Sequence, residues 1–261
     1  MKHGLLLLVA AGLVIGIFFV DPIAQDPAYH QFADARRLVG IPNFWNVTSN
    51  LLFLIVGALG LRYLAGADLP GVLPGLMPAY RVFFVGILLT AFGSAWYHLG
   101  PGNDSLVWDR LPMTLAFMAL FSIVLGEHVS EALGRHMLLP LLAAGAGSVF
   151  FWFVSESHGQ GDLRPYALIQ FLPMILIPLV LQLYPSRFDR TGFIWGMIVV
   201  YAAAKLFEYA DYNVFRAALL ISGHSLKHLI AAAAPLLFLR GLQTRRLSRP
   251  PVTNGFGEKD H

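Results

Sequence analysis

Apolar residues in this chain gather in long, uninterrupted blocks and show no strict alternation of the kind that marks a half-buried strand. A helix needs about 20 mostly apolar residues to cross the hydrocarbon core of a bilayer. Segments rich in glycine and proline, which end helices, separate the blocks. The pattern therefore predicts eight membrane-spanning helices, at residues 5–20, 47–64, 82–99, 106–125, 137–154, 165–184, 192–209 and 217–239.

The composition agrees with an all-α integral membrane protein. Of the 261 residues, 57% are hydrophobic and 13% are charged, whereas a soluble domain carries about 25% charged residues. The chain contains no cysteine, which excludes disulfides, thiolate ligands and a cysteine nucleophile, so a metal site has to use His, Asp or Glu. The net charge of +3 is small, and binding to anionic lipid headgroups accounts for the basic tail. We therefore expect no nucleic-acid partner. No obligate protein partner is evident.

The blocks divide the chain into three parts. We expect an N-terminal transmembrane helix in residues 1–28, a seven-helix core in residues 29–240 and a basic, disordered tail in residues 241–261. The first part also has the form of a signal peptide, with a short basic start before an apolar run. Its run of 16 apolar residues is long for a signal peptide and its cleavage site is poor. We therefore expect an uncleaved helix.

The positions of Lys and Arg predict the orientation, since cytoplasmic loops carry an excess of both. With the N-terminus inside, eleven basic residues lie on the cytoplasmic side and five on the other. The five are Arg36, Arg37, Arg110, Arg164 and Arg216. Both termini are therefore expected in the cytoplasm.

Two histidines inside the last predicted span are the first candidate for chemistry. His224 and His228 are four residues apart, so they project from one face of a helix and can share a metal ion. Histidines can also simply hydrogen-bond between packed membrane helices. The pair alone leaves both interpretations open.

A second group of residues favours the metal. His98 lies near the outer end of its span, Ser94 lies one turn before it, and Asp109 opens the next span. Three imidazoles leave one position open on a tetrahedral zinc ion, which is typical of a catalytic site. One discrepancy remains, since His224 lies several residues inside its predicted span whereas His98 is almost at the end of its own. Either the last helix protrudes by about a turn or the glycine-proline loop after His98 dips inward.

The other polar residues near the spans have simpler explanations. We expect Asn46, Ser49 and Asn50 to hydrogen-bond neighbouring helices, and Lys205, Glu208 and Asp211 to form a buried ion-pair network with a proton path as the alternative. Lys227 is expected to pair with Glu208 or to extend toward the membrane surface. Glu156 and His158 are the competing metal ligands. The remaining histidines are expected in solvent: His3, His30, His128, His136 and His261.

The pattern formed by Ser94, His98, Asp109, His224 and His228 resembles the CREST superfamily of membrane hydrolases. That group includes the alkaline ceramidases, the progestin and adiponectin receptors and the GPI-lipid remodelling proteins. The segments "FADARRLVGIPNFWNVTSNLLF" and "SGHSLKHL" look most like bacterial members of the alkaline ceramidase branch. The resemblance covers residues 29–239 and implies a seven-helix CREST-type bundle with the first span as an addition.

The resemblance also implies roles for these residues. His98, His224 and His228 would bind one Zn²⁺, Asp109 would handle a proton and Ser94 would help to stabilise a developing oxyanion. We expect no calcium dependence, because Asp34 is the only acid in residues 29–43, which occupy the place of the acidic segment that binds Ca²⁺ in eukaryotic alkaline ceramidases.

The implied activity is a ceramidase-like hydrolysis of an N-acyl lipid such as ceramide to a sphingoid base and a fatty acid. The site would face the periplasmic side of a bacterial inner membrane. Zinc can also support a lipid esterase or phospholipase, or serve a non-catalytic lipid receptor of the same fold. Both alternatives remain open, although a receptor would be expected to carry a large soluble signalling domain.

Overall fold

The computed structural model describes residues 1–248, and that part of the chain is helical and contains no β-strand. The predicted all-α fold is confirmed: eight helices are long and apolar enough to cross a membrane. They contain α1 (Lys2–Gly16), α3 (Leu51–Leu64), α4 (Met77–Leu99), α5 (Asn103–His128), α6 (Glu131–Ser157), α7 (Arg164–Leu183), α8 (Gly192–Tyr209) and α10 (Gly223–Thr244). The shorter helices are α2 (Phe44–Thr48), α9 (Asp211–Ala218) and three 3₁₀ turns at Ile17–Phe19, Pro27–His30 and Pro74–Leu76.

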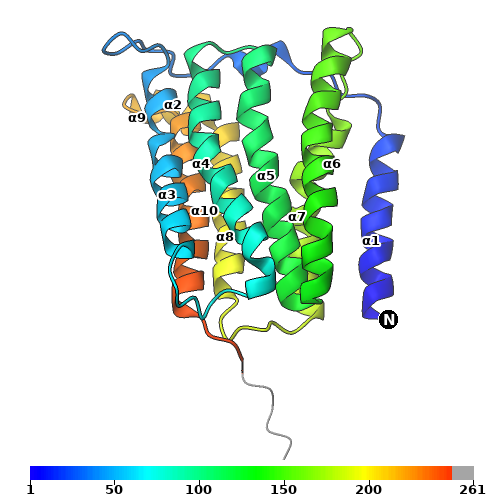
Figure 1. Ribbon diagram of the computed structural model, residues 1–261. Helices are drawn as coiled ribbons and strands as arrows, with labels where there is room; N and C mark the ends of the chain where they lie inside the picture. Colours follow the sequence, from blue (N-terminus) through cyan, green and yellow to red (C-terminus); the bar gives the residue numbers. More distant parts are fainter. Residues whose placement is uncertain (249–261) are drawn as a thin grey trace, which may run out of the picture.

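The long helices form an up-and-down bundle in which α5 is the most buried (Figure 1). Consecutive helices α3, α4, α5 and α6 pack side by side, α7 packs on α5 and α6, and α10 lies between α8 and α3. Large apolar side chains cover the outer surface, among them Leu139, Phe150 and Val199. An apolar exterior is what lipid-facing helices require, so the chain is an integral membrane protein.

Helix α1 stands at the edge of the bundle, where it packs mainly against α7 and against the 3₁₀ turn Ile17–Phe19 that follows α1 (Figure 1). None of its residues is fully buried. The apolar side chains that touch the bundle, Leu6, Val9, Ala10 and Leu13, follow the i, i+3, i+4, i+7 pattern and so lie on one face. The rest of α1 is exposed.

The bundle has two distinct ends. We call the end where α4 finishes at Leu99 and α10 begins at Gly223 the histidine end, and the opposite end, where α5 finishes at His128, the Glu127 end. Residues 20–43, between the turn after α1 and the start of α2, cross the histidine end (Figure 1). We call them the crossing segment. It is held there by hydrogen bonds from Leu163 to Ile23, from Gln25 to Glu156 and from Ala33 to Asp211.

The start of the last span differs from the sequence prediction. Residues 217–222 do not belong to α10, because α9 extends to Ala218 and the next residue, Leu219, caps it in a left-handed conformation (φ 56°). Ser222 then caps α10 by accepting a hydrogen bond from the backbone nitrogen of Ser225 (3.2 Å). The break lies within the apolar run "AALLI", so a count of apolar residues assigns both sides of it to one span. The cap places His224 in the first turn of α10, so neither the protruding helix nor the dipping loop is needed.

The other end of α10 also differs. The helix continues to Thr244 rather than ending near Leu239, and Arg245 is buried instead of belonging to a disordered tail. Arg246 and Ser248 are hydrogen-bonded to the loop between α7 and α8. The remainder of the predicted tail, residues 249–261, lies outside the described residues.

Candidate metal and lipid site

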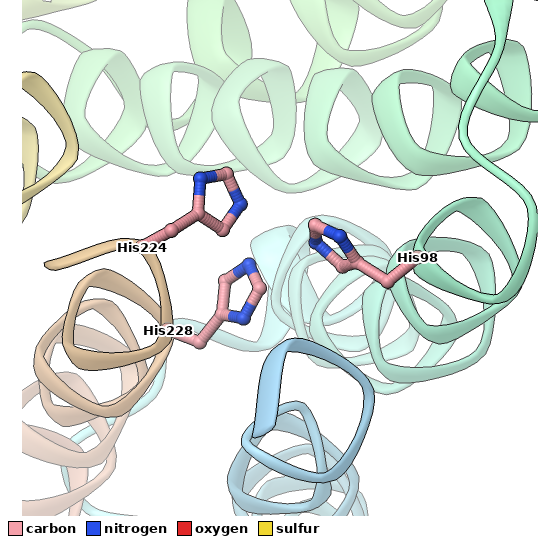
Figure 2. Close-up of side chains that lie close together, drawn as sticks. All are labelled: His98, His224 and His228. Carbon is pink, nitrogen blue, oxygen red and sulfur yellow. The ribbon is translucent and has the colours of Figure 1, made fainter. Parts of the chain in front are cut away.

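Three histidines from two helices meet at the histidine end of the bundle. His98 comes from the last turn of α4, and His224 and His228 come from the first two turns of α10. Figure 2 shows the three rings turned toward one another, with ring centroids 4.9 Å, 5.0 Å and 5.0 Å apart. All three are buried, and each offers a ring nitrogen within 4.8 Å of the others.

Neighbouring side chains orient two of the rings. The Ser49 hydroxyl lies 2.8 Å from Nδ1 of His228, which leaves Nε2 of that ring free. The Lys227 ammonium lies 2.9 Å from Nε2 of His224. Phe32 packs edge-on against His98 and His224, with both centroid distances 4.7 Å. The crossing segment thus shields the rings from water.

The cluster fits a metal ion. Nδ1 of His98 is buried and has no hydrogen-bond partner in residues 1–248. A buried nitrogen without a partner is unfavourable unless something else satisfies it. Imidazole donors without thiolates suit Zn²⁺, Cu²⁺, Fe²⁺ and Ni²⁺. The cluster can therefore hold a metal ion, and its donors suit an ion of this group.

Ser94 and Asp109 lie beside the cluster on two adjacent helices. Both side chains are buried, with 3% and 9% of their surface exposed, and both line the cavity described below. The helices approach closely there because Gly93 has no side chain: a Cβ atom at that position would lie 1.9 Å from the backbone oxygen of Trp108. Gly93 thus allows α4 to carry Ser94 next to the turn of α5 that carries Asp109.

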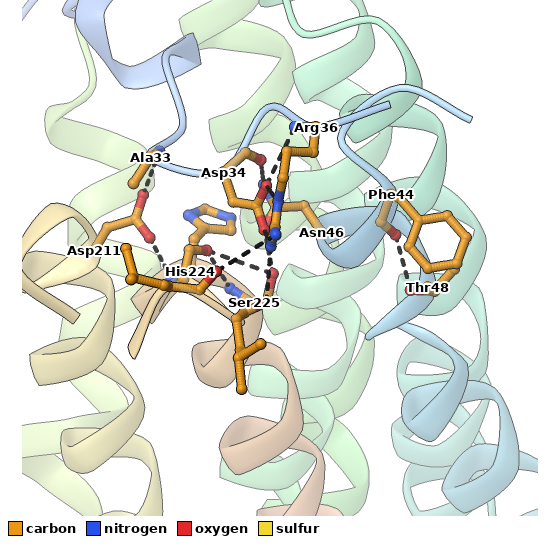
Figure 3. Close-up of polar contacts among 12 residues, drawn as sticks. Ala33, Asp34, Arg36, Phe44, Asn46, Thr48, Asp211, His224 and Ser225 are labelled. Atoms are coloured by element: carbon orange, nitrogen blue, oxygen red, sulfur yellow. Dashed lines mark hydrogen bonds and ion pairs between the residues drawn. The ribbon is translucent and has the colours of Figure 1, made fainter. Parts of the chain in front are cut away.

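The ion pairs near the site partly match the prediction. The Glu208 carboxylate accepts hydrogen bonds from Lys205 (2.6 Å) and from Lys227 (3.0 Å), as expected. Asp211 is not part of that network, which corrects the prediction. Its carboxylate accepts hydrogen bonds from the backbone nitrogens of His224 (2.7 Å) and Ala33 (2.9 Å). Figure 3 shows it between the crossing segment and the start of α10, where a negative charge is favourable.

The expected hydrogen bonds of Asn46 are present. Its side-chain oxygen accepts a hydrogen bond from the Ser225 hydroxyl (2.6 Å), and its amide donates to the backbone oxygen of Asp34 (3.3 Å) (Figure 3). The Asp34 carboxylate pairs with Arg36 (2.6 Å), which raises the pKa of that guanidinium. Asn46 of α2 therefore connects α10 with the crossing segment.

A cavity of about 410 Å³ begins beside the histidines and extends into the bundle between α4, α5, α7, α8 and α10. Ser94, Asp109 and His228 line its polar part, and it reaches as far as Ile194 at the other end of α8. The rise from Ile194 to Glu208 along α8 is roughly 21 Å at 1.5 Å per residue. One leaflet's acyl chains fill about half of a 30 Å hydrocarbon core, so the cavity is long enough for one acyl chain. Its deep walls are apolar, including Leu120, Ile177, Met197 and Ala234.

Several predicted residues lie elsewhere. Glu156 does not join the cluster, because its carboxylate accepts a hydrogen bond from the backbone nitrogen of Gln25 (3.0 Å), and His158 is exposed. His128 is buried rather than solvated and lies 3.2 Å from the backbone oxygen of Tyr184. His30 is half-buried and contacts Tyr97 and Asn103. His261 lies outside the described residues.

Sequence reasoning missed two residues, one in the cavity wall and one packed against the histidines. Arg110 was assigned to the membrane surface, yet it is 4% exposed and lines the cavity. Its position directly after Asp109, inside an apolar block, was a signal that a charge within a span has a partner or a function. Phe32 gave no comparable signal, because a phenylalanine before a span is unremarkable.

The fold and the site define a class: a helical membrane protein with a buried histidine cluster, able to hold a metal, beside a cavity sized for a lipid chain. The family model described as Ceramidase matches residues 39–248, so the chain belongs to the ceramidase family, as the resemblance predicted. A comparison with curated proteins gives no match. The family supports a hydrolase that acts on amide bonds of a lipid substrate.

Proposed function

We propose that this protein is a zinc-dependent hydrolase of an N-acyl lipid amide, such as ceramide, and that it releases a sphingoid base and a fatty acid. The observation that carries the proposal is the histidine cluster at the mouth of an acyl-chain-sized cavity in a chain of the ceramidase family. The apolar cavity would hold the acyl chain, which leaves the amide at the polar end.

His98, His224 and His228 would hold the zinc ion. Zinc supplies Lewis-acid chemistry and makes water a nucleophile at neutral pH. Ser49 keeps the ring of His228 oriented through its hydrogen bond to Nδ1, and the Asp211 carboxylate fixes the backbone of His224. Such supporting contacts preserve the geometry of a ligand set.

Asp109 would act as the general base and acid. Water adds its oxygen to the amide carbon while the Asp109 carboxylate accepts a proton. The same proton then passes to the nitrogen of the leaving amine as the carbon–nitrogen bond breaks, because an amine leaves poorly as an anion. The burial of Asp109 beside the cavity supports this role.

Ser94 would stabilise the charge that develops on the carbonyl oxygen. A hydroxyl held in a site from which water is excluded can donate a hydrogen bond to that oxygen, and such donors lower the barrier of acyl transfer. Ser94 is buried and lines the polar end of the cavity. Its neighbours on α4 and α5 are closely packed, so its position is fixed before substrate binds.

We infer that the site faces the periplasm of a bacterial inner membrane and that both termini are cytoplasmic. The first residue and the end of α10 lie at the same end of the bundle, opposite the histidines (Figure 1). Removing the buried Arg110 and Arg245 from the charge count leaves ten basic residues on the proposed cytoplasmic side and four on the other. The positive-inside rule therefore still favours this orientation.

The test is a lipid-product screen by mass spectrometry on purified wild type and the Asp109→Asn variant, with the metal content of both measured in parallel. We expect the wild type to carry about one zinc per chain and to release fatty acid from ceramide or another N-acyl lipid. Asp109→Asn should retain the zinc and lose roughly 10²- to 10⁴-fold in rate, the usual contribution of a general acid–base group.

Two results of this screen would contradict the proposal. Product from ester lipids alone would indicate the esterase. No product from any lipid class would favour a receptor.

A further inference from the structure

Arg110 is a buried cation beside the cavity that no part of the proposed chemistry uses. It follows Asp109 on α5, is 4% exposed and contributes to the cavity wall. Its Nη2 donates a hydrogen bond to the side-chain oxygen of Gln25 (2.7 Å). Its Nη1 is buried and has no hydrogen-bond partner within residues 1–248.

Aromatic rings surround the guanidinium. Its central carbon lies 4.1 Å from the ring centre of Trp152, 4.6 Å from that of Tyr166 and 5.7 Å from that of Tyr29. The faces of such rings attract a cation and fix its orientation. They do not neutralise its charge, and Gln25 is neutral as well. The guanidinium is thus held in place without forming an ion pair with any residue from 1 to 248.

Three of the other charges around the cavity are paired with one another, whereas Asp109, like Arg110, forms no ion pair in the described residues. Five charged side chains line it: Asp109, Arg110, Lys205, Glu208 and Lys227. Both lysines form ion pairs with Glu208, whereas Arg110 forms no ion pair in the described part of the chain. A buried charge without a partner is strongly unfavourable, and the cavity is the space from which an anion can approach it.

We propose that Arg110 binds a carboxylate carried by the lipid in the cavity. Arginine suits this role because its planar guanidinium can donate two parallel hydrogen bonds to a carboxylate. Two groups can supply the carboxylate: the head group of an N-acyl amino acid, or the fatty acid that hydrolysis releases. Both sources rest on the proposed function, which makes the lipid an N-acyl amide and the fatty acid its product. Recognition of the carboxylate is a binding property.

The test is a binding measurement in detergent with two pairs of ligands. N-hexadecanoylglycine and N-hexadecanoylethanolamine share the chain and the amide but differ in charge, and hexadecanoic acid and hexadecanol form the second pair. We expect the wild type to bind the acidic member of at least one pair about tenfold more tightly or better, which corresponds to one charge-assisted hydrogen bond. A preference in the first pair assigns the head group, and a preference in the second assigns the product.

The variant Arg110→Gln should lose the preference for the acid while its affinity for the neutral member stays within about twofold of the wild type. Binding of the neutral ligand thereby shows that the variant is folded. Arg110→Lys, which keeps the charge but not the planar fork, should retain part of the preference. This second variant keeps the test decisive should Arg110→Gln fold poorly.

Arg164→Gln is the matched control. Arg164 carries the same charge at the same end of the bundle, but it is paired with Asp162 (2.8 Å) and does not line the cavity. It should leave the preference unchanged. The proposal is wrong if the wild type binds both members of each pair equally, or if Arg164→Gln removes the preference as fully as Arg110→Gln. Because binding needs no turnover, a protein that hydrolyses no amide can still pass this test.

Discussion

The two ends of the bundle each bury an arginine, and the two arginines differ in what they contact. At the Glu127 end, Arg245 donates hydrogen bonds to both carboxylate oxygens of Glu127 and to the backbone oxygen of Gly71 (2.9 Å). The Tyr80 hydroxyl donates to the same carboxylate (2.5 Å). At the histidine end, Arg110 has one neutral hydrogen-bond partner, Gln25.

The same contrast extends to the groups around each arginine. Although burial opposes its charge, the Glu127 carboxylate raises the pKa of Arg245, and the ring of Phe188 covers the guanidinium at 3.9 Å. At the histidine end, Nδ1 of His98 and Nη1 of Arg110 are both buried without a partner in the described residues. At the Glu127 end Nε2 of His128 also lacks a partner there, but the buried charges of Arg245 and Glu127 are paired. Unsatisfied buried groups are rare in folded proteins, and a bound ion or water is one explanation for them. The comparison assigns stability to one end and binding to the other.

The largest effect on function should come from His98→Ala. Loss of this ring should remove the bound metal and lower the rate of hydrolysis by more than about 100-fold. A loss of about 100-fold is the upper limit for a residue that only supports a metal ligand, and a ligand itself should matter more. The melting temperature of the metal-free protein should change little, because Nδ1 of His98 leaves no protein partner behind. Metal analysis, turnover and thermal unfolding in detergent check the three parts.

His136→Ala is the control for that variant, because His136 is an exposed histidine on α6, remote from the cluster. It should retain metal and activity. Full metal content in His98→Ala would remove this residue from the ligand set. If His98→Ala unfolds in the absence of metal, the histidine end also contributes to stability, which contradicts the assignment of stability to the Glu127 end alone.

The largest effect on stability should come from Glu127→Ala. This change leaves Arg245 charged and buried without a partner, which costs about 3–5 kcal/mol in a buried ion pair. The protein that remains folded should keep its metal. Chemical unfolding in mixed detergent micelles measures the loss of unfolding free energy. Metal analysis measures whether the folded protein keeps its metal.

A double variant sharpens this result. Glu127→Leu combined with Arg245→Met removes both charges, and replacing a whole buried pair by apolar residues is often neutral or stabilising. We expect the double variant to recover most of the lost stability. If it is as unstable as Glu127→Ala, packing around the pair rather than its charge accounts for the loss.

A smaller effect on the histidine end is expected from Ser49→Ala. The Ser49 hydroxyl contacts Nδ1 of His228, and loss of such a supporting contact typically lowers metal affinity about 10- to 100-fold. Competition with a zinc chelator measures the change. Ser148→Ala is the matched control, since Ser148 is also buried but its hydroxyl donates to the backbone oxygen of Gly145 in the same helix. Equal affinities in the two variants would show that Ser49 does not support the ligand.

Apolar blocks and charges within them predicted most of this architecture, because lipid forces helices to be long and makes polar residues in spans conspicuous. His98, His224 and Asp109 were found in this way. The break between α9 and α10 was missed, since the apolar residues on either side of it are continuous and the cap depends on one hydrogen bond of Ser222. Arg110 shows a further limit: its burial depends on rings from three distant segments, which no local pattern encodes.

The smallest effect should come from a second ion pair at the Glu127 end. Arg187 pairs with Glu131 (3.1 Å), but their side chains are 50% and 34% exposed. Water screens such a pair, so Arg187→Ala should cost less than about 1 kcal/mol of unfolding free energy. Its backbone nitrogen can still donate to the backbone oxygen of Glu127, since the substitution changes only the side chain. Unfolding measured beside Glu127→Ala then separates burial from the mere presence of an ion pair. If Arg187→Ala and Glu127→Ala lose the same unfolding free energy, then stability at this end does not depend on the buried Arg245.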